Sequence, residues 1–435
     1  MTRCAIVGGG VLGSTIALRL AQSGEQVTLF EAAPELGGLA SAWSLGDIVW
    51  DRHYHVTLLS DSHTRGLLAE LGLESEMQWV ETRTGSVYDG EIYSISNSIE
   101  YLRYPPLSLV DKFRLGATIL YGSRLKDWKR LESVPVEEWL RGVSGDAVFD
   151  KFWLPLLEAK LGDAYRETSA AFIWATIQRL YAARNSGMKK EMFGYVPGGY
   201  ARTLGRLGDT LEDHGVELRL SARVSRVGDG PTVESERGVE PFDRVIVTMA
   251  PPIARHIVDG LSPAEEERLA GIRYQGIVCA SLLLPGPITD FYLTYLHDPA
   301  PFTAIVEMSA FVDRSQFGGR SLVYLPRYCD PADPIFEESD DSIRDRFLDA
   351  LRRIHPDFDP ASTLAFKVSR VRNVFPVSSL GYSEGLPGFD TSMRGVHLIN
   401  SSQIVNGTLN VNDTLQLAER GVRHLTGLSD EVPAS

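Results

Sequence analysis

The first part of the chain spaces its apolar positions in a pattern that predicts a strand, a helix and a second strand. Residues 4–7 form a short apolar run, which is typical of a strand buried on both faces. Over residues 11–23 apolar side chains recur at helical spacing, and Gly24 follows where a helix would end. Residues 26–30 are again apolar and lead to Glu31. This strand–helix–strand unit is the building block of a parallel α/β sheet.

Further strand patterns appear only after a long interval. Residues 215–224 alternate apolar and polar positions after a Gly turn, and residues 242–250 form a buried run stopped by prolines. Residues 396–402 suit a last strand, and a helix is predicted over residues 413–424. The sheet is therefore expected to be assembled from segments far apart in the sequence.

The intervening segments mix helical and strand-like stretches and carry no nucleotide-binding pattern. We expect two domains, each assembled from segments that are not contiguous in the sequence. The length of the chain also favours more than one domain. The predicted nucleotide-binding domain comprises residues 1–60, 195–252 and 391–435. The predicted substrate-binding domain, a mixed α+β unit, comprises residues 61–194 and 253–390.

The turn after the first strand fits the G-x-G-x-x-G pattern, with Gly8, Gly10 and Gly13 at the marked positions. In such a turn the first Gly permits the tight bend and the second lets the backbone approach a pyrophosphate. The third Gly lets helix and strand pack closely, and the helix amino terminus stabilises the phosphates. Glu31, at the end of the second strand, suits both hydroxyls of an adenosine ribose and would repel the 2′-phosphate of NADP. The pattern predicts a dinucleotide site.

A second Gly pair, Gly37-Gly38, follows a few residues after Glu31, and Ser41 comes next. This arrangement resembles the extended FAD fingerprint of the superfamily of amine oxidases, protoporphyrinogen oxidases and phytoene desaturases. The resemblance implies an α/β fold with a Rossmann-like, glutathione-reductase-like FAD-binding domain. It also implies that the second Gly pair passes close to the diphosphate and that Ser41 faces the cofactor. FAD is therefore the expected cofactor.

The same resemblance extends to the rest of the predicted nucleotide-binding domain. It implies that the backbone of Val224 contacts the adenine. Asn400 stands where the family usually has Gly-Asp or Gly-Glu, and its amide can still hydrogen-bond a ribityl hydroxyl. Asn410 precedes the last predicted helix, whose amino terminus is suited to stabilise negative charge on a reduced flavin.

The segment from Asp51 to His55 contains two histidines and resembles the family's strand that lines the flavin. His53 replaces an expected Gly. Either His53 or His55 suits a general base at neutral pH, and a structural role is equally open for each. Two histidines two residues apart also share one face of a strand and suggest a zinc pair, but no convincing third ligand is nearby. We therefore predict no metal.

Candidate substrate contacts come from the predicted second domain. An aromatic-rich helical stretch carries polar side chains among core positions, and a later strand begins with side chains expected to face the flavin from the sheet side. The substrate candidates are Gln178, Arg179, Tyr181 and Arg273, and Tyr274 is a further catalytic candidate.

Composition narrows the function classes. The formal net charge is −14, from 43 Lys and Arg against 57 Asp and Glu, and such an acidic surface disfavours nucleic-acid binding. The three cysteines are widely separated and form no C-x-x-C pair, which supports neither a disulfide framework nor a zinc knuckle. The apolar start of the chain does not resemble a signal peptide, so a cytoplasmic protein is expected.

Residues 112–130 form a basic stretch around an apolar centre, although no run of the chain is apolar enough to span a bilayer. A helix of this kind can lie in a membrane interface, and an ordinary solvated helix is the alternative. The sequence gives no indication of oligomeric state.

The predicted activity is oxidation of a small organic substrate, by dehydrogenation or desaturation, with hydride transfer to flavin N5. Residues 271–285 contain no Lys, and this argues against the amine oxidases that use a Lys near N5. Two alternatives remain open. One is a sugar-nucleotide mutase resembling UDP-galactopyranose mutase, without net redox change, and the other is a flavin-binding protein without catalysis.

Overall fold

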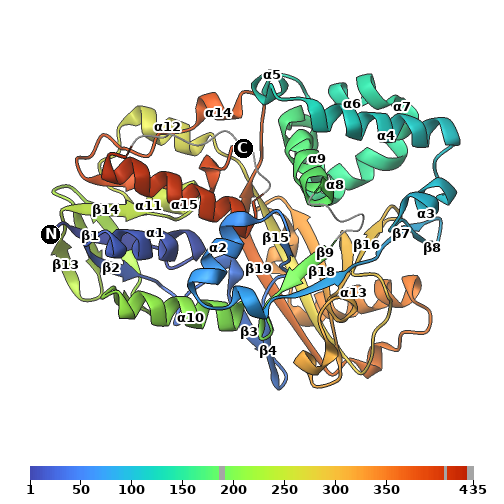
Figure 1. The fold of residues 1–435 in the computed structure, drawn as a ribbon, viewed down its shortest axis with the longest axis horizontal. Coiled ribbons are helices and arrows are strands. Elements are labelled where there is room, and N and C mark those ends of the chain that lie inside the picture. Colours follow the sequence, from blue (N-terminus) through green and yellow to red (C-terminus); the bar gives the residue numbers. More distant parts are fainter. Residues whose placement is uncertain (186–191, 406–408, 429–435) are drawn as a thin grey trace.

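A five-stranded parallel sheet carries the amino-terminal Gly-rich turn at the end of its central strand (Figure 1). The structure is a computed structural model that describes residues 1–185, 192–405 and 409–428. Every neighbouring pair in this sheet is parallel. In spatial order the strands are β10 (Glu217–Arg219), β2 (Gln26–Phe30), β1 (Arg3–Val7), β14 (Arg244–Val247) and β20 (Val396–Leu398).

Both faces of this sheet are covered, which explains the continuous apolar run in β1. One face packs on α1 (Val11–Gln22), α10 (Gly199–Asp213) and α15 (Val411–Thr426), with Ile16 and Leu211 fully buried between them. The other face packs on a small antiparallel sheet and on the short helix α11 (Pro251–Ile257). The antiparallel sheet comprises β11 (Val224–Gly228), β12 (Thr232–Ser235) and β13 (Gly238–Pro241).

A seven-stranded mixed sheet forms the base of the second half of the molecule. Its long strand β15 is buried over its whole length, because α13 (Asp340–Ile354) covers one face and further elements cover the other. In spatial order the strands are β19 (Ala365–Pro376), β15 (Tyr274–Leu284), β18 (Ser321–Cys329), β17 (Ala304–Glu307), β16 (Leu293–Leu296), β7 (Thr84–Tyr88) and β8 (Glu91–Ser94).

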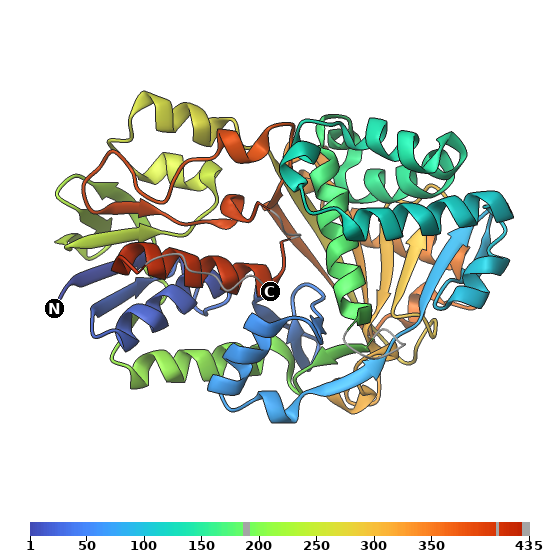
Figure 2. The same cartoon turned by 45° about the horizontal axis from the view of Figure 1, so that its top comes forward.

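A layer of helices lies beside this sheet and has its own apolar core (Figures 1 and 2). Its helices are α3 (Ser98–Arg103), α4 (Leu109–Arg124), α5 (Trp128–Glu132), α6 (Val136–Ser144), α7 (Asp146–Val148), α8 (Leu154–Leu161) and α9 (Ala170–Asn185). The predicted fold class, a Rossmann-like α/β domain with a mixed α+β domain, is confirmed. In the described part of the chain no helix combines the length and apolarity needed to cross a membrane.

Two short sheets join the halves. The hairpin of β3 (Ala42–Leu45) and β4 (Ile48–Asp51) leads from the Gly pair toward the mixed sheet. The strand β9 (Met192–Tyr195) pairs with β5 (Thr57–Leu58) and with β6 (Gln78–Glu81).

The expected domain boundaries differ from the observed packing. The helix α2 (Ser62–Glu70) packs on α15 and contributes to the core of the parallel sheet, although the sequence predicts it in the substrate-binding domain. The helices α11 and α12 (Pro263–Ala270) likewise pack on the opposite face of that sheet. Nothing in their sequences marks a nucleotide-binding domain, because they contribute apolar side chains rather than a motif.

The strand predicted over residues 215–224 is also two strands rather than one. Ser221, with φ at 51°, breaks the extended chain between β10 and β11. The break moves the chain from the parallel sheet to the antiparallel sheet that covers it.

Candidate active site

In the Gly-rich turn, the backbone conformation and close packing at Gly8 and Gly13 leave no room for a side chain. Gly8 has φ at 115°, and a Cβ on it would lie 2.6 Å from Thr248 Oγ1. A Cβ on Gly13 would lie 1.9 Å from the carbonyl oxygen of Gly8, so only a Gly permits α1 to pack this closely on β1.

Gly10 differs from these two because the space beside it is open. Its φ of −68° is accessible to any residue, and among the described residues a Cβ there would meet only Gly38 Cα within 4 Å, at 3.9 Å. Gly37 N donates to Gly9 O at 2.8 Å, which holds the two Gly segments against each other. The amino terminus of α1 has no side-chain cap. Its N–H groups are therefore available to an anion.

Glu31 is fixed beside this turn by two backbone donors. Its Oε2 accepts a hydrogen bond from Gly9 N at 2.7 Å, and its Oε1 accepts one from Ala33 N at 2.8 Å. A carboxylate has further acceptor capacity, so ribose hydroxyls can still donate to it. The carbonyl of Glu31 accepts from Ala222 N at 2.8 Å, and this places the start of β11, with the buried Val224, close to the same edge.

The loop after the second Gly pair connects to the histidine segment. Ser41 is buried, and its carbonyl accepts a hydrogen bond from Arg52 N at 2.9 Å. The segment that contains His53 and His55 therefore starts directly beside the Gly pair.

Asn400 follows β20 by two residues and is fully buried. Its Oδ1 accepts hydrogen bonds from the backbone N and the hydroxyl of Ser402, at 3.1 and 2.6 Å. Its Nδ2 has no partner among the residues that the structure describes. An unsatisfied buried amide is costly, and a ligand hydroxyl or carbonyl would satisfy it.

Asn410 has a more local role than expected. Its Oδ1 caps α15 by accepting a hydrogen bond from Asp413 N at 2.9 Å, and its Nδ2 donates to Asp413 Oδ2 at 2.6 Å. Burial raises the pKa of Asp413. The amino terminus of α15 is thus partly satisfied by its own chain.

These features together fit a dinucleotide. FAD would fill the open space beside Gly10 and bring phosphates to the uncapped N–H groups of α1. It would also offer a hydrogen-bond acceptor to Nδ2 of Asn400, which has no partner among the described residues. In residues 1–185, 192–405 and 409–428 no cluster of three His, Cys, Asp or Glu side chains could hold a metal. The three cysteines are free and buried.

His53 is buried and both of its ring nitrogens have partners. Nδ1 lies 3.3 Å from Leu39 O, and Nε2 lies 3.0 Å from Ser369 Oγ on β19. Since a carbonyl only accepts, Nδ1 carries the proton and Nε2 accepts from the serine hydroxyl. Burial lowers the pKa of His53 to about 4, with a smaller contribution from His55. The geometry favours a neutral His53 that ties the Gly-pair loop to the mixed sheet.

We predict that His53 makes folding pH-dependent. Between its ordinary pKa of 6.5 and its folded value of about 4, the unfolded chain binds a proton that the folded chain does not. Stability at neutral pH is therefore lost as the pH falls through this window, by roughly 3 kcal/mol. In urea titrations, His53→Gln should flatten the dependence by about this amount. His214→Gln, at an exposed site, is the control and should retain it. An unchanged slope for His53→Gln would contradict the prediction.

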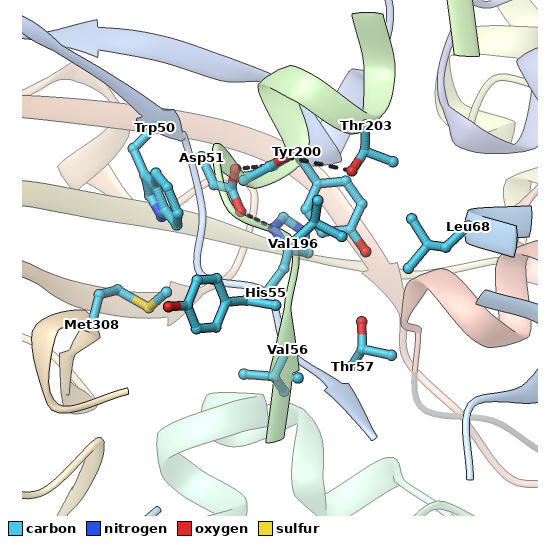
Figure 3. Close-up of a pocket in the computed structure, with 13 residues that line it drawn as sticks. Trp50, Asp51, His55, Val56, Thr57, Leu68, Val196, Tyr200, Thr203 and Met308 are labelled. Carbon is cyan, nitrogen blue, oxygen red and sulfur yellow. Dashed lines mark hydrogen bonds and ion pairs between the residues drawn. The ribbon is translucent and has the colours of Figure 1, made fainter. Parts of the chain in front are cut away.

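His55 faces a small enclosed cavity with Asp51 and Tyr200 (Figure 3). Its Nδ1 lies 3.8 Å from Asp51 Oδ2 and has no hydrogen-bond partner in the described part of the chain. Its ring packs against that of Tyr200, with centroids 4.9 Å apart. The cavity volume, about 20 Å³, suffices for one water but not for an organic substrate. Of the two histidines, His55 is therefore the one with a ring nitrogen that makes no hydrogen bond in the described chain.

Tyr274 is buried at the start of β15, and its hydroxyl lies 3.2 Å from Ser401 Oγ, next to Asn400. Burial raises the pKa of Tyr274. The phenol is thus neutral at physiological pH and lies beside the carboxyl-terminal cofactor segment.

The structure does not bring all the predicted substrate residues to this region. Gln178 donates to Gly122 O at 2.9 Å and so ties α9 to α4. Arg273 is exposed and pairs with Glu167 and, at 3.8 Å, with Asp330. Since both its partners lie on the surface, Arg273 does not face the site.

Two substrate candidates remain. Arg179 Nη2 lies 3.5 Å from Asp61 Oδ2, which links α9 to the start of α2. Burial raises the pKa of Asp61, although Arg179 opposes this. Tyr181 belongs to α9, but its side chain lies outside the described residues.

A cluster missed from the sequence lies between the mixed sheet and the helical layer. The hydroxyls of Tyr54 and Tyr328 are 3.0 Å apart. The Lys160 ammonium, on α8, lies 3.7 Å from the ring centroid of Tyr328 and 4.8 Å from that of Phe375. Lys160 has no carboxylate partner in the described chain. The absence of Lys from residues 271–285 did not reveal Lys160, because Lys160 comes from a helix distant in sequence.

The chain matches known sequences over most of its length. The family profile described as "Flavin containing amine oxidoreductase" matches residues 14–393. The zeta-carotene desaturase of Synechocystis sp. is 24% identical over 81% of this chain and 83% of its own length. The coproporphyrinogen III oxidase of Mycobacterium tuberculosis is 26% identical over 65% of this chain and 66% of its own length. With a further zeta-carotene desaturase, from Synechococcus elongatus, the chain spans about half (51%) of the relative.

Solved structures share the fold over nearly the whole chain. A putrescine oxidase bound to putrescine superposes with a TM-score of 0.76 at 17% identity, covering 98% of this chain and 99% of that one. A reduced UDP-galactopyranose mutase superposes with a TM-score of 0.75 at 14% identity, covering 99% and 97%. At these identities the likeness shows the fold alone.

Proposed function

This chain belongs to the family of flavin-containing amine oxidoreductases, and from that premise we propose that it dehydrogenates or desaturates a small organic substrate. Membership confirms the resemblance, the FAD cofactor and the class of FAD-dependent oxidoreductase that the sequence predicts. When bound, FAD supplies a hydride acceptor at N5 of its flavin. The observation that carries the proposal is the contact between the Gly segments and the histidine segment, which joins a nucleotide site to the mixed sheet.

The chain's own residues divide into binding and positioning groups. We assign the diphosphate to the backbone at Gly8, Gly10 and Gly38 and the ribose to Glu31. The unpartnered Nδ2 of Asn400 would donate to the cofactor.

We assign proton handling to His55, acting through the one water that its cavity can hold, because its Nδ1 has no hydrogen-bond partner among the described residues and lies close to the Asp51 carboxylate. His53 is a positioning residue, since both its ring nitrogens are engaged. Replacing His55 by Gln should therefore change the pH profile of turnover.

The substrate is proposed to be neutral or anionic rather than cationic. The apolar core beside the histidine segment includes the buried side chains of Ile277, Cys279 and Tyr324, and it would exclude water from the reacting carbon. The Lys160 ammonium at the edge of this core would repel an amine cation and attract a carboxylate.

Lys160→Met is expected to raise KM for a carboxylated substrate about tenfold, since one charge-assisted hydrogen bond is lost. The KM of a neutral analogue should not change. Steady-state kinetics on both substrates measures the difference, and Lys151→Met, at an exposed site in the segment Phe149–Trp153 just before α8, is the matched control. Equal effects of Lys160→Met on both substrates would exclude a role in charge recognition.

A mutase that uses reduced flavin remains the alternative, since one such enzyme shares the fold. Anaerobic mixing of the holoenzyme with candidate substrates separates the two. Bleaching of the flavin absorbance together with an oxidised product supports dehydrogenation. Turnover that requires reduced flavin but consumes no reductant supports the mutase. A flavin that no candidate substrate reduces, and that catalyses no isomerisation, supports a binding protein.

A further inference from the structure

The helix α4 exposes an apolar face to solvent. Leu109, Val110 and Phe113 in its first turns are 73%, 62% and 80% exposed, and Leu120 and Tyr121 continue the face toward its carboxyl end. Figure 2 shows α4 (teal) on the outside of the helical layer. Single exposed apolar residues are ordinary, but a continuous row of them on one helix indicates a contact surface.

The inward face of α4 packs Leu115 into the core of the helical layer, and the polar groups buried beside it are satisfied. The buried Lys112 donates through Nζ to Leu102 O at 2.8 Å, and the buried Thr118 donates to Arg114 O at 2.9 Å. Asp111 and Ser108 cap the helix reciprocally. These contacts fix the rotation of α4, so the apolar face is held outward.

The neighbouring helix α3 enlarges this surface. Ile99 and Leu102 are 64% and 54% exposed, and the bond from Lys112 to Leu102 O holds α3 against α4. The exposed apolar side chains form what we call the α3–α4 patch: Ile99, Leu102, Leu109, Val110, Phe113, Leu120 and Tyr121. The apolar centre expected from the sequence differs, because Leu115 is buried and the exposed face lies closer to the amino end of α4.

In the stretch of chain that carries the patch, residues 98–130, the exposed charges are almost all positive. Between residues 98 and 130, Asp127 is the exposed acid among the side chains that the structure describes. The exposed basic residues of the same stretch are Arg103, Arg114, Arg124, Lys126, Lys129 and Arg130. None of these six forms an ion pair within the described chain. They are concentrated here although the whole chain carries a net charge of −14.

We propose that the α3–α4 patch docks the protein on the surface of an anionic lipid bilayer. Apolar side chains that enter the headgroup region, flanked by Lys and Arg that attract anionic lipids, are the two requirements of interfacial binding. A second copy of the chain is a poorer occupant. A two-fold contact through this patch would place its unpaired cations against the same cations of the other copy. This proposal does not depend on the proposed function.

The test is co-sedimentation of the full-length holoenzyme with phosphatidylcholine vesicles, with and without phosphatidylglycerol. We expect binding to the anionic vesicles and much weaker binding to the neutral ones. Phe113→Ser should lower the partition constant about tenfold. Arg124→Gln with Lys126→Gln should lower it about thirtyfold on anionic vesicles. Leu364→Ser, at an apolar site 55% exposed elsewhere, should have no effect.

Two results would overturn the proposal. One is the absence of binding to anionic vesicles, or binding that Phe113→Ser leaves unchanged. The other is a dimer in lipid-free solution that Phe113→Ser converts to a monomer, since the patch would then be an interface between copies. Flavin absorbance of each variant, unchanged from the wild type, verifies that the site remote from the patch is intact.

Discussion

Gly10→Val should give a folded protein that no longer retains FAD, with affinity at least about a hundredfold weaker, or roughly 2.7 kcal/mol. The backbone at Gly10 has φ at −68°, so it accepts a side chain without strain, and Gly38 Cα at 3.9 Å is the nearest obstacle to a Cβ. The valine side chain would instead occupy the open space beside the α1 terminus, where the pyrophosphate must approach. Flavin absorbance per protein and the melting temperature of the apoprotein measure the two effects separately.

The matched control is Gly205→Val, at a position on α10 where a Cβ meets nothing within 4 Å. It should retain its flavin. If Gly10→Val also keeps FAD at wild-type affinity, the diphosphate does not lie on this turn. If Gly10→Val fails to fold, the open position has a structural role that its geometry does not show.

The sequence predicted the parts of this site that depend on local spacing. The strand, turn and helix around Gly8 and Gly13 follow from residues within one short segment, because hydrophobic period and Gly position are local properties. Glu31 was located in the same way, at the end of β2. The continuous apolar strands also imply that both faces of the parallel sheet are covered.

The sequence could not predict contacts that join distant segments. His53 meets Ser369 on β19, and Lys160 meets the aromatic rings of Tyr328 and Phe375, through the packing of whole domains. The sequence predicts Arg273 at the site because a strand begins there. Its side chain instead pairs with the exposed Glu167, and the alternation along a strand does not predict such a partner beside the strand's end. The direction of a side chain at the end of a strand or helix is therefore known only from the structure.

Asp51 shows the same limit, because its contact with α10 joins segments far apart in the sequence. It is the last residue of β4, and its carboxylate lies at the amino terminus of α10. It is 4% exposed, and its Oδ1 accepts a hydrogen bond from Tyr200 N at 2.7 Å. A Cβ on Gly199 would lie 2.7 Å from the same oxygen, so the helix start fits around the carboxylate. Asp51 therefore satisfies the positive end of the α10 dipole from a strand far away in sequence.

Asp51→Ala is expected to lower the free energy of unfolding by about 4 kcal/mol, because a charge-assisted hydrogen bond and the helix-terminal charge are both lost. Asp51→Asn keeps the oxygen acceptor and should cost about half as much. Urea denaturation of the apoprotein measures both changes. Asp47→Ala, which removes an exposed partner of Arg320 in the same hairpin, should cost much less. Equal losses for Asp51→Ala and Asp47→Ala would show that the carboxylate of Asp51 does not stabilise α10.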